Sequence, residues 1–305
     1  MACANDSAYR GQGPQAWLLD NSTRLHLQHG PIDLLVDAKG SSNDVQRAFE
    51  QAVIAFGDIL EILAAQLPIL RKTYTPQNNQ DFIGPVAHRM KQAIEPYTEF
   101  NLTPMIAVAG AVADHVLSNM ILGCDLFRAQ VNNGGDIAFY LNDESELKIG
   151  VCTSPESTVH DDIITLKSED GVGGVATSGW KGRSHSLGIA DAVTVLAPTA
   201  AAADTAATLI ANAVDLPHSN RILRTPASRL DSDTDLGDRL VTVDVSILCA
   251  KEKKQALDSG ERCARKIMEK GHVEGCYLHV QGLTRLVFSA NSQRLIPTGY
   301  HYVNG

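Results

Sequence analysis

The sequence predicts an α+β fold of mixed, mostly antiparallel sheets with packed helices. Helical patterns lie mostly near the two ends of the chain, and short runs of β-branched and apolar residues cluster between them. This order is typical of α+β proteins, whereas strands and helices alternate in a doubly wound parallel sheet. The 305 residues are 44% hydrophobic and can bury a sizeable core. We expect an N-terminal arm over residues 1–23 and a single domain over 24–305.

The first part of the chain is expected to contain extended structure and then three helices. Alternating and then continuous apolar residues predict extended structure over 25–38. Asn43 is a candidate N-cap for the first helix, which runs to about Leu67 because its apolar residues recur at three- and four-residue spacing. A second helix is expected over about 84–94, and a third begins with Thr103 as its cap.

Strands dominate the chain after Gly123. Short β-branched and apolar runs separated by turn residues predict them. The predicted strands carry the sequences LFRAQV, IAFYLN, LKIGVC, DIITLK, GVATSG, DAVTVLA, RLVTVDVSIL, CYLHVQG and TRLVFSA. Among them lie an alanine-rich helix at 200–214 and a helix at about 251–270. No repeat or low-complexity linker divides this region, which supports one domain.

Composition and charge exclude several classes of partner. A formal net charge of −9 and a pI near 5.5 argue against nucleic-acid binding and against an anionic membrane surface. No apolar run reaches the ~18 residues of a membrane span, and no signal peptide is evident. The six cysteines lack any C-x-x-C pair and are expected to be free thiols. We expect a cytoplasmic protein that binds a small molecule, and the alanine-rich helix faces leave a homo-oligomer open.

Three segments resemble known functional motifs but lack features that those motifs require. The segment GVGGVA at 171–176 has dinucleotide-binding spacing, but no apolar strand precedes it and no helix follows it. The acidic loop DSDTDLGDRLVT carries Leu236 and Thr242 where a calcium loop needs glycine and glutamate. His185 lies between two serines, yet neighbours on a strand point to opposite faces, and no G-x-S-x-G elbow is present. These motifs therefore predict no activity.

One polar pair stands out on the alanine-rich helix. Asp204 and Thr208 in ADTAATLIANA are four residues apart, so their side chains project from one helix face and can converge on one point. Asp204 is expected in the first turn, where the helix dipole favours an anion. A carboxylate and a hydroxyl are oxygen ligands suited to Mg²⁺, which shares its coordination with water and phosphates. The alternative is that Asp204 only caps the helix while Thr208 packs.

Glycines and cations at three places are candidates for ligand contact. Gly134 and Gly135 in NNGGD allow a backbone to approach a ligand, or they form an ordinary tight turn between two strands. Gly110 costs a helix about 0.5–1 kcal/mol relative to alanine, which favours a role in close packing or ligand approach. Lys181 and Arg183 in GWKGRS are candidate phosphate contacts, with a solvated turn as the alternative.

Several segments in the same order resemble one family. The segments are QHGPIDL, TPMIAVAGAVADHV, NNGGDI, ATSGWKGRSHSLGIADAVTVLA and ADTAATLIANA. They resemble the FAD:protein FMN transferase (ApbE) superfamily, and over nearly its whole length the chain resembles the ApbE-like family UPF 0280. Ala109 stands where the transferases commonly carry a polar residue, and WKGRSHSLGIA replaces their loop with histidine and Asp-Pro-x-Thr-Gly. The resemblance implies an ApbE-like (T-fold-like) fold.

The resemblance also implies a site. Its aspartate–threonine pair matches Asp204 and Thr208 as ligands of Mg²⁺, and its bound molecule would be FAD or FMN. Asp114 matches an aspartate of the family's helix. The positions implied to contact the bound molecule are Gly110, Asn133, Gly134, Gly135, Thr177, Ser178, Lys181 and Arg183. No catalytic residue is assigned, and the candidates are His185, Asp191 and Ser178.

Together these observations favour a metal-dependent enzyme, a transferase or hydrolase that acts on a flavin- or nucleotide-like phosphorylated ligand. The cation would neutralise charge on the pyrophosphate. Two alternatives stay open. The same pocket could bind or hydrolyse a small cyclic metabolite without a metal, or the chain could be a non-catalytic accessory protein.

Overall fold

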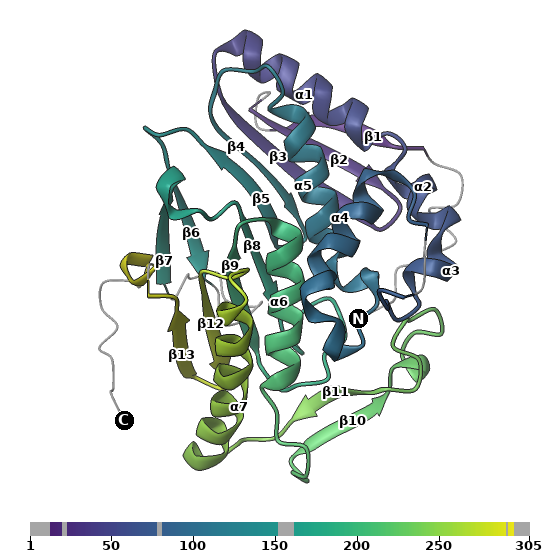
Figure 1. The fold of residues 1–305 in the computed structure, drawn as a ribbon, viewed down its shortest axis with the longest axis vertical. Helices are drawn as coiled ribbons and strands as arrows, with labels where there is room; N and C mark the ends of the chain where they lie inside the picture. The colour runs from purple at the N-terminus through teal and green to yellow at the C-terminus, as the bar shows by residue number, and fades with distance from the viewer. Residues whose placement is uncertain (1–12, 20–22, 78–80, 152–161, 291, 296–305) are drawn as a thin grey trace. The chain divides into compact units, whose positions relative to one another are not determined.

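The computed structural model describes most of the chain, and Figure 1 shows its ribbon. The described residues are 13–19, 23–77, 81–151, 162–290 and 292–295. Contacts divide the chain into two compact units, Met1–Ser145 and Glu146–Gly305. Each unit combines antiparallel strands with packed helices, which confirms the predicted α+β class. The single domain over 24–305 and the arm over 1–23 stay predictions, although Gln15–Leu19 of that arm form a strand.

Five strands among the described residues of the N-terminal unit form an antiparallel sheet in the order β1-β2-β3-β4-β5. Their bounds are β1 Gln15–Leu19, β2 Arg24–His29, β3 Ile32–Gly40, β4 Leu126–Asn133 and β5 Asp136–Leu141. The β2–β3 hairpin pairs Leu27 with Leu34 and Leu25 with Val36, and all four side chains are buried. Alternation therefore gives this sheet one buried face.

Helices pack on that buried face or against one another beside it. They are α1 Ser42–Phe56, α2 Ile59–Ala65, α3 Leu67–Leu70, α4 Gly84–Ile94 and α5 Val108–Met120, with 3-10 turns at Glu95–Phe100 and Pro104–Ala107. α5 contacts β4 and β5, α1 contacts β3, and both α1 and α4 contact α5. The helix predicted at 84–94 is confirmed with those bounds.

The first helix differs from the prediction at both ends. Its N-cap is Ser41, whose hydroxyl accepts a hydrogen bond from the backbone N–H of Asp44 at 3.2 Å, and not Asn43. α1 ends at Phe56, and α2 starts only after Asp58, whose φ of −118° is not helical. Buried apolar residues keep three- and four-residue spacing across this break, at Phe56, Ile59 and Leu63, so periodicity alone does not reveal it.

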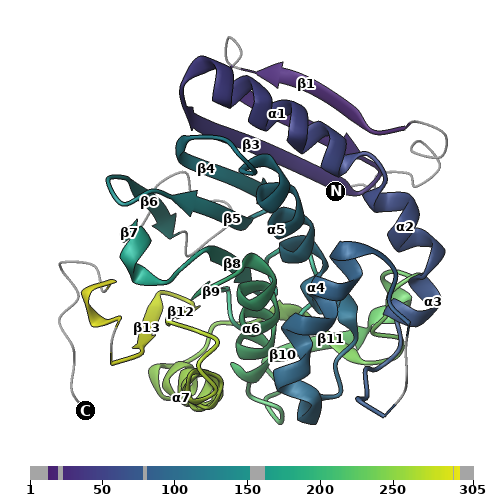
Figure 2. The ribbon, with the colours of Figure 1, turned by 45° about the horizontal axis from the view of Figure 1, so that its top comes forward.

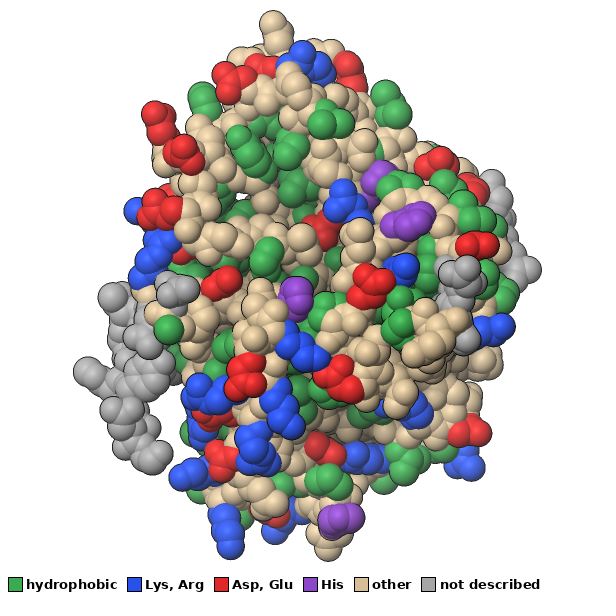
Figure 3. Space-filling view, viewed as in Figure 1, with side chains coloured by type: hydrophobic (Ala, Val, Ile, Leu, Met, Phe, Trp, Pro, Cys, Tyr) green, Lys and Arg blue, Asp and Glu red, His purple; other side chains and the backbone are tan. Residues whose placement is uncertain are grey.

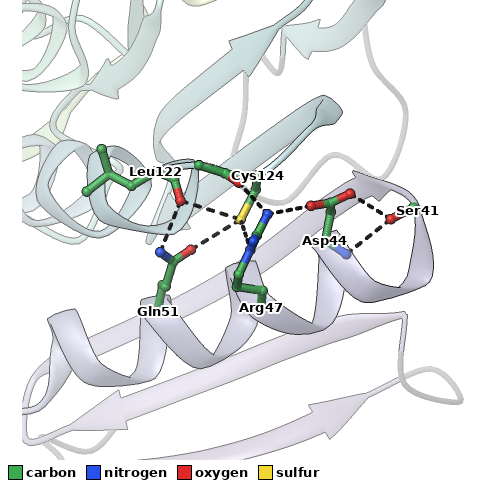
Figure 4. A network of polar contacts seen from close by, with 7 residues as sticks. Ser41, Asp44, Arg47, Gln51, Leu122 and Cys124 are labelled. Carbon is green, nitrogen blue, oxygen red and sulfur yellow. Dashed lines mark hydrogen bonds and ion pairs between the residues drawn. The ribbon is translucent and has the colours of Figure 1, made fainter.

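Side chains of α1 fix it to the loop after α5, as Figure 4 shows. Arg47 Nε donates to Cys124 Sγ at 3.3 Å, and the same guanidinium contacts Asp44 and the carbonyl of Gly123. Gln51 Nε2 donates to the carbonyl of Leu122 at 3.1 Å. The loop therefore satisfies its carbonyl groups through α1, and the helix pair is held at its polar edge as well as in its core.

The described C-terminal unit contains the antiparallel strands β8, β9, β12 and β13 in that order. Its strands are β6 Glu146–Val151, β7 Asp162–Lys167, β8 Gly174–Ser178, β9 Ala192–Ala197, β10 Ile222–Pro226, β11 Leu240–Val245, β12 Gly275–Val280 and β13 Leu283–Phe288. β6 pairs with β7, and β10 pairs with β11, as two separate hairpins. The sequence did not predict β10, which is short and half exposed.

Two helices pack on this sheet, side by side in Figures 1 and 2. α6 Ala200–Ala213 contacts β8 and β9, and α7 Ala250–Glu269 contacts β12 and β13. Small residues let α6 lie close to its neighbours. A Cβ on Gly174 would lie 2.1 Å from the backbone nitrogen of Ala200, and one on Gly188 would lie 2.0 Å from the carbonyl oxygen of Ala211. The neighbouring segments therefore carry glycine where they meet the backbone of α6, and most alanines of the helix are buried.

No helix within the described ranges is long and apolar enough to cross a membrane.

Candidate functional site

The predicted metal pair lies on α6, and its surroundings decide between the two interpretations of Asp204. Thr199 is the N-cap of α6, and its hydroxyl accepts from the backbone N–H of Ala202 at 3.2 Å. Asp204 is the fifth residue of the helix, so its expected place in the first turn is wrong, and it does not cap the helix. Asp204 and Thr208 are both half-buried. The capping alternative is therefore removed.

Thr208 meets another candidate residue. Its Oγ1 donates to Ser178 Oγ at 3.4 Å, which joins the middle of α6 to the last residue of β8. Asp204 lies one turn before Thr208 on the same helix face. The neighbouring Thr177 points elsewhere, because alternate residues of a strand face opposite sides, and its Oγ1 lies 2.8 Å from Thr194 Oγ1 of β9. The structure thus brings Thr208 to Ser178, and helix spacing puts Asp204 on the same face as Thr208.

The donor set of this group can be compared with the needs of Mg²⁺. It offers one carboxylate and two hydroxyl groups, which are hard oxygen donors. The described residues hold no group of three or more His, Cys, Asp or Glu that could bind a metal by themselves. Mg²⁺ commonly takes one or two carboxylates and completes its shell with water and substrate phosphates. The residues present therefore fit a Mg²⁺ ion shared with a phosphorylated ligand, and do not form a closed protein cage.

The Asp191 carboxylate is buried, and both of its oxygens accept hydrogen bonds. Its side chain is 3% exposed, and its two oxygens accept from Trp180 Nε1 at 3.2 Å, from Lys181 Nζ at 3.0 Å and from the backbone N–H of Gln281 at 2.5 Å. Lys181, predicted as a phosphate contact, is therefore in an ion pair. Trp180 and Gln281 belong to this cluster, although no motif or spacing in the sequence selects either residue. Gln281 comes from the β12–β13 turn, 90 positions from Asp191.

The remaining candidates of the C-terminal unit lie on the segment after Lys181. Arg183 is exposed and His185 is half-buried, and neither forms a hydrogen bond or ion pair with the residues that the structure describes. The hydroxyl of Ser186 is buried and donates to Asn212 Oδ1 at 3.3 Å. A Ser186–His185 catalytic pair is thus disfavoured by the Ser186 hydrogen bond, and not by the strand argument, because residues 179–191 lie between β8 and β9 and form no strand. His185 itself keeps both ring nitrogens available.

The double glycine forms the turn between β4 and β5. Gly134 has φ of 65° and Gly135 has φ of 117°, conformations that favour glycine, and Asn132 Oδ1 accepts from the Gly135 N–H at 2.8 Å. A Cβ on Gly135 would have nothing within 4 Å. A two-residue hairpin loop with positive φ at both positions explains both glycines. Ligand contact at this turn stays a prediction.

The turn is tied to the start of α5. Asn133 Nδ2 donates to the carbonyl of Ala109 at 3.1 Å, one residue before Gly110. Gly110 and Asp114 are both buried in α5. Asn133, Gly110 and the double glycine are thus brought together in the N-terminal unit, whereas Asp204, Thr208 and Ser178 lie in the C-terminal unit. The single pocket expected to combine the two groups stays a prediction.

Comparison with known proteins gives a consistent family. The family model described as AbpE bacteria matches residues 15–286. A UPF0280 protein of Methanothrix thermoacetophila is 34% identical over 168 residues, which are 54% of this chain and 68% of the relative. A UPF0280 protein of Methanopyrus kandleri is 31% identical over 192 residues, which are 63% of this chain and 73% of the relative.

A UPF0280 protein of Methanococcoides burtonii is 35% identical over 130 residues, 42% of this chain and 53% of the relative, so this chain spans about half of that protein. Among solved structures, the apo form of the flavinyl transferase ApbE from Pseudomonas stutzeri has a TM-score of 0.40 at 12% identity, covering 94% of this chain and 97% of its own. The flavin transferase ApbE from Vibrio cholerae has a TM-score of 0.39 at 11% identity, and the match covers 92% of this chain and 100% of that structure's chain.

Proposed function

The chain belongs to the AbpE bacteria family, and on that premise we propose that it is a metal-dependent, ApbE-like enzyme. Its ligand would be flavin- or nucleotide-like and would carry a phosphate or pyrophosphate group, with FAD, FMN and ADP as the compounds to test. The observation that carries this proposal is the group of Asp204, Thr208 and Ser178 at the junction of α6 and β8. Its oxygen donors suit a cation that is shared with phosphate.

Each residue of the group has a distinct part in this proposal. The Asp204 carboxylate would supply the negative charge that holds Mg²⁺, and the Thr208 hydroxyl a second oxygen one helical turn away. A bound Mg²⁺ would stabilise negative charge on the transferring or leaving phosphate group. The Ser178 hydroxyl, 3.4 Å from that of Thr208, would donate a hydrogen bond to a phosphate oxygen or coordinate the cation through its oxygen. Transfer and hydrolysis differ only in whether an acceptor or water attacks.

Positive charge for the phosphates would come from the segment after β8. Lys181 and Arg183 are both exposed there, and Arg183 forms no ion pair with any described residue. His185 follows two residues later, is half-buried and is the candidate that could accept or donate a proton near the ligand. Asp191 is withdrawn from the candidates for proton transfer, because its carboxylate already accepts three hydrogen bonds.

We also place the protein in the cytoplasm. The cysteines that the structure describes are Cys124, Cys249, Cys263 and Cys276, and all four are free thiols. Free thiols are typical of a reducing compartment. On the face shown in Figure 3, Lys and Arg are accompanied by Asp and Glu, which supports a small ligand over a nucleic acid as the partner.

Equilibrium binding tests the proposed function. Purified protein is titrated calorimetrically with FAD, FMN and ADP, first with Mg²⁺ and then with EDTA. We expect at least one of the three to bind, with an affinity at least ten-fold higher when Mg²⁺ is present. For a ligand that binds, chromatography of the incubated mixture then shows whether the pyrophosphate of FAD or ADP, or the phosphate ester of FMN, is cleaved. Equal affinity with Mg²⁺ and with EDTA for all three compounds, or no binding at all, contradicts the proposal.

A further inference from the structure

The turn that follows β8 is fixed by a hydrogen bond within the turn and by backbone contacts to Ala190 and Asp191. The backbone N–H of Trp180 donates to the carbonyl of Ala190 at 3.0 Å, and that of Gly182 closes the turn onto Gly179 at 3.0 Å. A Cβ on Gly179 would lie 2.4 Å from the carbonyl oxygen of Asp191, so the two backbones touch. This turn begins immediately after Ser178, and its position therefore determines where that hydroxyl lies.

Asp191 anchors the side chains of the same turn. Its buried carboxylate holds the Trp180 indole N–H and the Lys181 ammonium on Oδ1, and the Gln281 N–H on Oδ2. Gln281 has φ of 42°, an uncommon conformation for a residue other than glycine, and this turn conformation aims its N–H at the carboxylate. A carboxylate with three donors is well compensated for its burial.

Lys181 is held by its ammonium group, and its side chain remains partly open to solvent. Its ammonium lies 3.0 Å from Asp191 Oδ1 and 5.6 Å from the centre of the Trp180 ring, while its side chain is 39% exposed. An ammonium has three N–H donors, and the contact with Asp191 uses one of them. A free lysine on a surface turn must lose rotamer freedom to bind an anion, whereas this one is already oriented.

We propose that Asp191 is a positioning residue that orients the Lys181 ammonium for a phosphate group of the ligand, with Trp180 as the wall against which the lysine lies. The proposal rests on the proposed function in one respect, that the ligand carries phosphate. The charge of Asp191 does not prevent this, because three donors compensate it and the exposed Arg183 adds a second cation two residues beyond Lys181.

A double-mutant cycle in EDTA tests the proposal. The chain has two tryptophans, Trp17 and Trp180, so Trp17→Phe leaves Trp180 as the single tryptophan. In that background, inorganic pyrophosphate is titrated while Trp180 fluorescence is recorded for the parent, Lys181→Met, Asp191→Asn and the double variant. We expect Lys181→Met to weaken binding at least ten-fold, Asp191→Asn to weaken it three- to ten-fold, and the double variant to bind no worse than Lys181→Met.

Two results would overturn the proposal. One is an Asp191→Asn variant that loses the same factor in affinity whether residue 181 is lysine or methionine, since Asp191 would then act independently of Lys181. The other is a parent protein that does not bind pyrophosphate in EDTA. The proposed function is tested separately, by the binding of FAD, FMN and ADP with Mg²⁺ and with EDTA, so a failure of this proposal and a failure of the proposed function are distinguishable.

Two further variants guard against misfolding. Lys181→Arg keeps a cation beside Asp191 and should keep the affinity for pyrophosphate within about three-fold of the parent. If Asp191→Asn does not fold, as judged by circular dichroism, Asp191→Glu takes its place in the cycle. It keeps the charge but displaces the carboxylate by one methylene, so it should again weaken binding only when Lys181 is present.

Discussion

The hydroxyl of Thr208 on α6 lies 3.4 Å from the hydroxyl of Ser178 at the end of β8. This is long for a hydrogen bond between hydroxyl groups, so it contributes little to stability by itself. Its importance is that it places two oxygen donors, 30 positions apart in the chain, where one cation or phosphate oxygen can contact both. Asp204 adds a carboxylate one turn earlier on the same helix face.

Thr208→Val tests whether that hydroxyl binds a ligand or only packs. Valine keeps the branched shape and removes the oxygen, so we expect a loss of at most about 1 kcal/mol in the free energy of unfolding. The stabilisation by Mn²⁺ in the presence of ADP should be reduced. Thr205→Val is the matched control, since buried Thr205 on the same helix donates to the carbonyl of Ala201 at 3.0 Å. Equal loss of Mn²⁺ stabilisation in both variants would show that the effect is not local to Thr208.

Gly174→Ala tests the close approach of β8 to α6. The added Cβ would lie 2.1 Å from the Ala200 nitrogen, a backbone atom that cannot move alone, so we expect destabilisation by roughly 3 kcal/mol. Gly57→Ala is the control, because Gly57 has helical φ and ψ and a Cβ there would be 3.4 Å from its nearest neighbour. It should be neutral or stabilising by about 0.4–1 kcal/mol. Urea denaturation measures both, and a Gly174→Ala protein as stable as wild type would contradict the packing described.

His115 on α5 should make stability depend on pH. Burial, and then the nearby Arg89, lower the pKa of His115, while Asp58 and the carbonyl of Ala55 oppose that shift. With a folded pKa below the unfolded value, the unfolded chain binds the proton first, so stability is fully present above about pH 6.5 and falls as the pH drops towards the folded pKa.

His115→Gln removes this titration. The free energy of unfolding, measured in urea from pH 7.5 to 5.5, should fall less steeply for the variant than for wild type. Other histidines titrate in the same range in both proteins, so the difference between the two slopes isolates His115. Identical slopes would show that the environment of His115 does not affect its protonation.

Thiol labelling should separate the cysteines by environment. Burial raises the pKa of Cys263 to about 11 and raises that of Cys276 further, so neither should react with a thiol reagent in the folded protein at pH 8. The exposed Cys249 should react within minutes. After unfolding without reductant, all six thiols should be counted, and a count below five would contradict the cytoplasmic assignment.

Local patterns in the sequence predict most of the elements. The helix at 84–94 and most of the strands after Gly123 follow from apolar spacing and turn residues, which are short-range signals. The break in the first helix cannot be predicted from these signals, because apolar spacing continues across Gly57 and Asp58. Its N-cap is misplaced by two residues because Ser41 and Asn43 are both good caps.

The candidate site is only partly predictable, because short-range patterns do not report contacts between residues that are far apart in the sequence. Asp204 and Thr208 are four residues apart on one helix, so their shared face follows from sequence spacing. The contacts that define Asp191 come from Trp180, Lys181 and Gln281, and the last of these is brought in by a turn 90 residues away. No local pattern reports such a contact, so the sequence alone does not distinguish Asp191 from the other polar residues near the turn.

Asp204→Asn provides the most direct test of the metal site. Melting temperatures are measured for wild type and variant with ADP, in Mg²⁺ and in EDTA. With free ligand about 100-fold above its dissociation constant, binding to the folded state adds about 2.7 kcal/mol, a rise of roughly 5 °C for wild type. Asparagine keeps the shape but loses the charge that a hard cation requires, so the variant should melt near wild type in EDTA and lose most of the Mg²⁺-dependent rise. A full rise in Asp204→Asn, or none in wild type, would contradict the account.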